Sequence, residues 1–89
     1  MEAKPSAVDV ISVCSASGEI RPLRVQLIDE EHQLIRVNIE QVVKCEEVIH
    51  VGAEAKIFLC RATVWGHKWL FELKYSIRSH SWCLTRRLH

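Results

Sequence analysis

The sequence predicts an all-β domain, a small antiparallel meander of five to six strands that closes into an SH3-like or similar barrel. Residues 67–77 place hydrophobic or aromatic side chains at odd positions and mostly polar ones between them. This period of two is typical of a strand with one buried face. Short apolar runs recur elsewhere between polar turns, and closure into a barrel would remove the free edges of so small a sheet.

Each strand is expected where an alternating apolar run lies between turn residues. The strands are predicted at residues 8–14, 23–27, 34–39, 56–64, 67–77 and 82–88. The side chains that share the inward parity form the expected core: Ile11, Val25, Leu27, Val37, Trp69, Phe71, Leu73, Tyr75, Trp82 and Leu84.

Residues 40–50 fit two different elements. Ile39, Val42, Val43 and Ile49 have a spacing that one face of a short helix would show. The same residues are β-branched and stiff at χ1, which favours a strand. We expect a bent or bulged strand here and keep one short helix as the alternative.

The length of 89 residues predicts one domain. Residues 8–89 are expected to form it, after a flexible leader at residues 1–7. The leader is polar and lacks the apolar segment of a secretory signal. No apolar run reaches the roughly 20 residues of a membrane span. We therefore expect a cytoplasmic protein that does not bind membranes.

The charge is divided unevenly along the chain. Residues 1–55 hold ten acidic residues and five Lys or Arg, whereas residues 56–89 hold one acidic residue and seven Lys or Arg. All six aromatic residues also lie at or after Phe58. This split can steer an anionic partner, or the two parts can attract each other within one barrel.

Catalytic and metal chemistry find little support in the sequence. The four cysteines show no C-x-x-C spacing and should be reduced thiols in the cytoplasm. His80 and Cys83 are three apart, so on a strand they would point to opposite faces. The three glycines form no phosphate loop or nucleophile elbow. We expect no enzyme, no cofactor and no metal site.

The predicted strand at 56–64 is apolar at both parities, although a strand with one wet face should alternate. A second subunit or a helix at 40–50 would then cover its outer face. This pattern predicts a protein-interaction or assembly module that forms a homodimer or binds another protein. The predicted interface residues are Phe58, Ala62, Val64 and Leu70.

The alternative is a small barrel that binds single-stranded nucleic acid through the basic C-terminal hairpin. Such barrels stack bases on aromatic side chains within a basic groove. Most aromatic residues here have core parity, which leaves Trp65 in a turn as the stacking platform. The residues of this alternative are Trp65, Lys68, Lys74, Arg78 and Arg87.

Five short motifs are spaced along residues 8–88. They are Val8-Asp9-Val10-Ile11, Gly18-Glu19-Ile20-Arg21-Pro22-Leu23-Arg24, Phe58-x-Cys60, Phe71-Glu72-Leu73-Lys74-Tyr75 and Trp82-x-Leu84. Together they resemble a group of small uncharacterised all-β proteins of Firmicutes. The resemblance implies a bacterial, intracellular β domain of unknown function, and it assigns no site residues.

Overall fold

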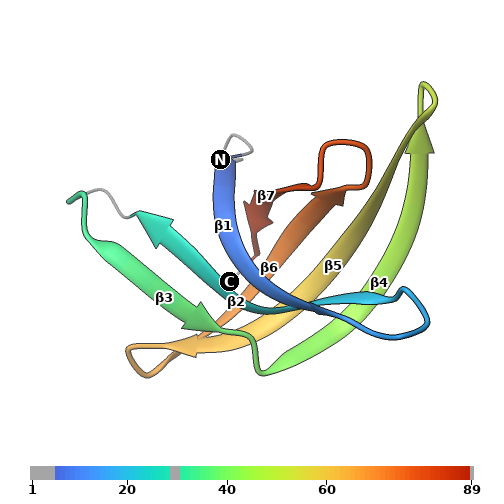
Figure 1. The fold of residues 1–89 in the computed structure, drawn as a ribbon. Helices are drawn as coiled ribbons and strands as arrows, with labels where there is room; N and C mark the ends of the chain where they lie inside the picture. Colours follow the sequence, from blue (N-terminus) through green and yellow to red (C-terminus); the bar gives the residue numbers. More distant parts are fainter. Residues whose placement is uncertain (1–5, 29–30, 89) are drawn as a thin grey trace.

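The fold is one curled antiparallel sheet of seven strands (Figure 1). The computed structural model describes residues 6–28 and 31–88. The strands are β1 (Ser6–Cys14), β2 (Ile20–Ile28), β3 (Leu34–Asn38), β4 (Gln41–His50), β5 (Ala53–Val64), β6 (His67–Ser76) and β7 (Ser81–Arg87). Their order across the sheet is β3-β2-β1-β7-β6-β5-β4. The predicted all-β, barrel-like class is confirmed.

Strand β1 joins the two parts of the sheet. Its beginning, Ser6–Val8, pairs with β7, and its remainder from Asp9 to Cys14 pairs with β2. The sheet therefore curls into a half-barrel in which β2 and β3 lie over β5, β6 and β7 (Figure 1). The predicted leader at 1–7 is wrong for Ser6 and Ala7, which belong to β1, and residues 1–5 lie outside the described part.

Residues 41–50 account for the seventh strand. They form β4, which pairs with β5 throughout its length, so the helix alternative is wrong. Val42 lies opposite Cys60 and Lys44 lies opposite Leu59, which leaves Val43 as an extra residue. Such a bulge bends a strand, and the bent or bulged strand expected from the β-branched residues is confirmed. Within the described ranges no helix occurs, and therefore none that could span a membrane.

The core lies inside the curl. Phe71 and Leu73 on β6 are 3% and 0% exposed, and Val25 and Val37 on β2 and β3 are 1% exposed. The Trp82 ring lies 5.5 Å from Phe58 and 4.8 Å from Tyr75, between ring centroids. Nine of the ten expected core residues are buried or pack against the core. The exception is Ile11, which is 48% exposed on the outer face of β1.

The two edge strands carry features that discourage pairing with another sheet. Strand β3 is only five residues long. Strand β4 is longer, but it contains the bulge at Val43 and the charged residues Lys44, Glu46 and Glu47. Charges, bulges and short length are the usual protections of an exposed edge. We therefore expect this protein to associate through a face of the sheet and not through the edges of β3 and β4.

Two hairpins have two-residue turns of the same type. Val51-Gly52 joins β4 to β5 with φ angles of 52° and 78°, and Trp65-Gly66 joins β5 to β6 with 51° and 78°. Positive φ at both central residues defines a type I′ turn, which favours Asn-Gly. Valine and tryptophan in this conformation are strained because Cβ approaches the following carbonyl oxygen.

Replacing Val51 by Asn should therefore stabilise the fold. Val51 is 92% exposed, so the substitution removes almost no packing. We expect Val51→Asn to raise the free energy of unfolding by about 1 kcal/mol, since the left-handed conformation costs a non-glycine residue roughly 1–2 kcal/mol. Urea denaturation followed by tryptophan fluorescence measures the change. A lower unfolding midpoint would contradict the strain in this turn.

Candidate functional site

The predicted interface residues on β5 lie in the core. Phe58, Ala62 and Val64 are 2%, 1% and 5% exposed and face the inside of the curl. Their assignment to the outer face was wrong because the hairpin register decides which parity is buried. Phe58 lies opposite Leu73 and Cys60 lies opposite Phe71, so even-numbered residues of β5 share the face of odd-numbered residues of β6. Of the four predicted residues, Leu70 alone points outward.

The outer face of β5 nevertheless carries apolar side chains. Ile57 and Leu59 alternate with the core residues and are half-buried, as is Leu70 on β6. Leu88, just beyond β7, is 37% exposed, and its N–H donates to the Leu70 carbonyl oxygen at 2.7 Å. We call Ile57, Leu59, Leu70 and Leu88 the outer patch. Strand β5 is thus apolar on both faces.

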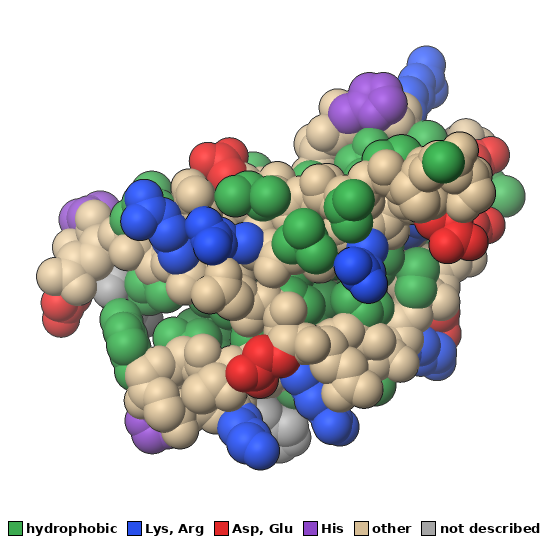
Figure 2. All heavy atoms as spheres, turned by 60° about the horizontal axis from the view of Figure 1, so that its bottom comes forward, with side chains coloured by type: hydrophobic (Ala, Val, Ile, Leu, Met, Phe, Trp, Pro, Cys, Tyr) green, Lys and Arg blue, Asp and Glu red, His purple; other side chains and the backbone are tan. Residues whose placement is uncertain are grey.

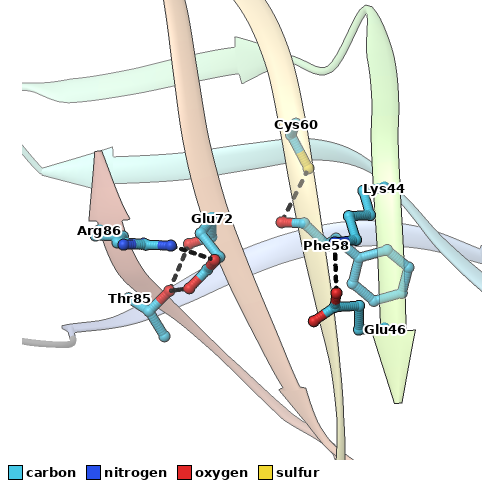
Figure 3. A network of polar contacts seen from close by, with 7 residues as sticks. All are labelled: Lys44, Glu46, Phe58, Cys60, Glu72, Thr85 and Arg86. Carbon is cyan, nitrogen blue, oxygen red and sulfur yellow. Dashed lines mark hydrogen bonds and ion pairs between the residues drawn. The ribbon is translucent and has the colours of Figure 1, made fainter. Parts of the chain in front are cut away.

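Polar pairs lie on both sides of the outer patch (Figure 3). On β4, the Lys44 ammonium lies 2.6 Å from a Glu46 carboxylate oxygen, and this hydrogen bond raises the pKa of Lys44. On the other side, Arg86 on β7 lies 3.3 Å from Glu72 on β6. The Thr85 hydroxyl donates to the same carboxylate at 2.9 Å. Each side therefore presents one cation and one anion.

Charged and apolar side chains alternate on a larger scale too. In the face shown in Figure 2, hydrophobic side chains form separate groups with Lys, Arg, Asp and Glu side chains between them. The groups do not merge into one continuous apolar surface. Small separate apolar groups are common on soluble proteins and do not by themselves indicate an interaction surface.

A hollow of about 610 Å³ lies between the β1–β2 hairpin and the inner side of β4 and β5. Phe58 and Val42 contribute apolar lining, and Cys45 is the thiol in it. Partial burial raises the pKa of Cys45, although Lys56 opposes the shift. The Lys56 ammonium already lies 3.9 Å from Glu47. The thiol is therefore protonated near neutral pH, a poor state for a nucleophile.

The residues of the predicted nucleic-acid stripe are only partly brought together. Trp65 is 74% exposed in the β5–β6 turn, and Lys68 is exposed close to it on β6. The Arg87 guanidinium lies 4.0 Å from the centroid of the Trp69 ring at the same end of the hairpin. Lys74 is half-buried further along the outer face, and Arg78 lies in the β6–β7 turn. The stripe is thus divided between the two ends of β6.

His80 and Cys83, from which the sequence analysis expected no metal site, have different surroundings in the structure. His80 Nδ1 and the Tyr75 hydroxyl are 2.9 Å apart and share a hydrogen bond. Cys83 lies on the outer face of β7 opposite Lys74. Among the described residues, no three His, Cys, Asp or Glu side chains are grouped closely enough to hold a metal ion.

The sequence interpretation missed Arg61, Ile57 and Leu59 as surface candidates. Arg61 is exposed on the outer face of β5, opposite Leu70. The signal that would have found all three is the Trp65-Gly66 pair. A two-residue turn there fixes Val64 opposite His67, and every other pairing of the hairpin follows from it.

Comparisons with known proteins give no relatives. No family model, no curated protein and no solved structure matches the chain. The resemblance to Firmicutes proteins therefore stays a prediction.

Proposed function

We propose that this protein is a non-catalytic assembly module that self-associates through the outer patch. The observation that carries the proposal is the second apolar face of β5, where Ile57 and Leu59 lie opposite the core side chains of the same strand. No helix within the described ranges lies over this face. A second copy of the chain would remove these side chains from water, which stabilises an interface by roughly 25 cal/mol per Å² of apolar area.

The charges beside the patch favour a symmetric pairing. An isologous dimer needs a surface that is complementary to itself. The Lys44–Glu46 pair on one side and the Arg86–Glu72 pair on the other each offer both signs. A two-fold axis through the patch can therefore set the cation of one copy against an anion of the other, while the apolar middle is buried.

The compartment proposed for this module is the cytoplasm. All four cysteines are free thiols, including Cys14 and Cys45, which are exposed. Exposed free thiols suit a reducing compartment, because oxidising compartments convert them to disulfides or oxidised forms.

Introducing a charge into the outer patch should abolish self-association. We expect sedimentation equilibrium at micromolar concentration to give a dimer for the wild type and a monomer of about half that mass for Leu59→Lys. The new ammonium would be buried without compensation in the dimer, which costs far more than the exposed ion pairs return. In the monomer it keeps its contact with water, because Leu59 is only half-buried there.

The matched control is Leu23→Lys, at an exposed apolar position on β2. It adds the same charge outside the patch and should leave the dimer intact. A wild-type protein that sediments as a monomer across the micromolar range would refute the proposal. Dimer dissociation by Leu23→Lys but not by Leu59→Lys would place the interface on β1 and β2 instead.

A further inference from the structure

The β5–β6 turn holds a tryptophan in a costly position. Trp65 has a φ of 51° and is 74% exposed. The left-handed conformation disfavours a bulky residue, and the exposed indole gains little packing in return. Strain of this kind is found at sites where a side chain serves binding. The indole is therefore a candidate contact surface for a ligand.

A groove of about 460 Å³ lies further along the same hairpin; its lining residue nearest in sequence to Trp65 is Lys68, and Trp65 itself does not line it. Its lining residues are Arg61, Ala62, Lys68, Trp69 and Leu70 of the hairpin, with Gln41, the first residue of β4, and Glu40 just before it. Arg61 and Lys68 are diagonal neighbours in the hairpin, since Arg61 pairs with Leu70 and Lys68 pairs with Thr63. Neither cation takes part in an ion pair with another described residue. Both can therefore face an anionic ligand.

The charges of the groove leave a positive balance, because one carboxylate faces two cations there. The carboxylate that lines the groove, Glu40, accepts a hydrogen bond from the Thr63 hydroxyl at 3.1 Å. Arg87 lies over the Trp69 ring, on the inner side of the sheet beside Val25 and Val37. The end of the hairpin thus combines an exposed aromatic face with an excess of positive charge.

We infer that this end of the β5–β6 hairpin binds single-stranded nucleic acid, with one base stacked on Trp65 and the adjoining phosphates held by Arg61 and Lys68. Stacking on aromatic side chains beside a basic groove is how sequence-tolerant single-strand binding works. An acidic peptide would use the cations but has no need of an exposed indole. Leu70 belongs to both the groove and the outer patch, whereas Trp65, Arg61 and Lys68 lie outside the patch, so the inference goes beyond the proposed assembly function.

The test introduces asparagine at the first central residue of each of the two type I′ turns. Fluorescence polarisation at 50 mM salt uses fluorescein-labelled 12-mers of thymidine deoxynucleotides and of uridine ribonucleotides. We expect Trp65→Asn to weaken binding by about fivefold or more, since stacking one base contributes roughly 5- to 150-fold in affinity. Asn-Gly suits a type I′ turn, so this variant keeps its fold. Val51→Asn makes the same change in the opposite turn and should bind like the wild type.

Salt dependence separates phosphate contacts from stacking. Arg61→Gln and Lys68→Gln should each make the slope of log affinity against log salt shallower by about 0.7, the value for one phosphate contact on a single strand. Two results with the oligonucleotides would overturn the inference: wild-type affinity in Trp65→Asn, or no binding of either 12-mer at 50 mM salt and micromolar protein. Labelled polyglutamate that binds as tightly as the oligonucleotides would also overturn it and would indicate an acidic protein partner.

Discussion

Replacing Phe71 by Ala should lower the free energy of unfolding by about 3–5 kcal/mol, the usual cost of removing a buried phenylalanine ring. Phe71 is 3% exposed at the centre of β6, opposite Cys60 on one side and Arg87 on the other. A domain of this size has a net stability on the order of 5 kcal/mol. Much of the variant should therefore be unfolded at room temperature, as far-UV circular dichroism and urea titration would show.

Leu23→Ala is the control for this loss, because Leu23 on β2 is 40% exposed. Substitutions at such positions usually change stability by no more than about 0.5 kcal/mol. An unfolding midpoint for Phe71→Ala equal to that of Leu23→Ala would show that Phe71 is not part of the core.

Stability should also fall at alkaline pH because of Cys60. Its side chain is 0% exposed, and burial raises the pKa of the thiol from 9.0 to about 12. Below pH 9 the thiol is protonated in both folded and unfolded chains, so its contribution is constant. Between pH 9 and 12 the unfolded chain loses the proton while the folded chain keeps it. Folding should then lose about 1.4 kcal/mol for each pH unit in this window.

The Cys60→Ala variant isolates this contribution, because it removes the titrating group. Urea titrations between pH 8 and 11 should show a shallower loss of stability for Cys60→Ala than for the wild type. Parallel curves for the wild type and Cys60→Ala would contradict the raised pKa of Cys60.

The sequence predicted the fold class because β6 has an unusually regular pattern. Its odd-numbered residues from Trp69 to Tyr75 line the core, as the alternation indicated. Neighbouring β5 has no such pattern, since both of its faces are apolar. Whether the odd-numbered or the even-numbered residues of β5 are buried depends on which of them lie opposite the core residues of β6. The length of the turn at Trp65-Gly66 determines this pairing, and the sequence of β5 alone does not.

Residues 41–50 show a second limit of pattern reading. The extra residue at Val43 shifts the alternation by one position, so that Val42 and Cys45 share the inner side. A spacing of three along a bulged strand resembles one turn of a helix. Residues 41–50 form a strand because they pair with β5 along their whole length. Pairing between strands of this kind cannot be predicted from the sequence of the segment alone.

The pairing of β1 with β7 has a consequence for the order of folding. Ser6 lies opposite Leu84, and Val8 lies opposite Trp82, so these contacts close a loop that includes almost the whole chain. The hairpins from β4 to β7 need only short loops and can form first, since closure entropy grows with loop length. On the ribosome, β1, β2 and β3 must therefore wait for the last strand to emerge before the two parts of the sheet can join.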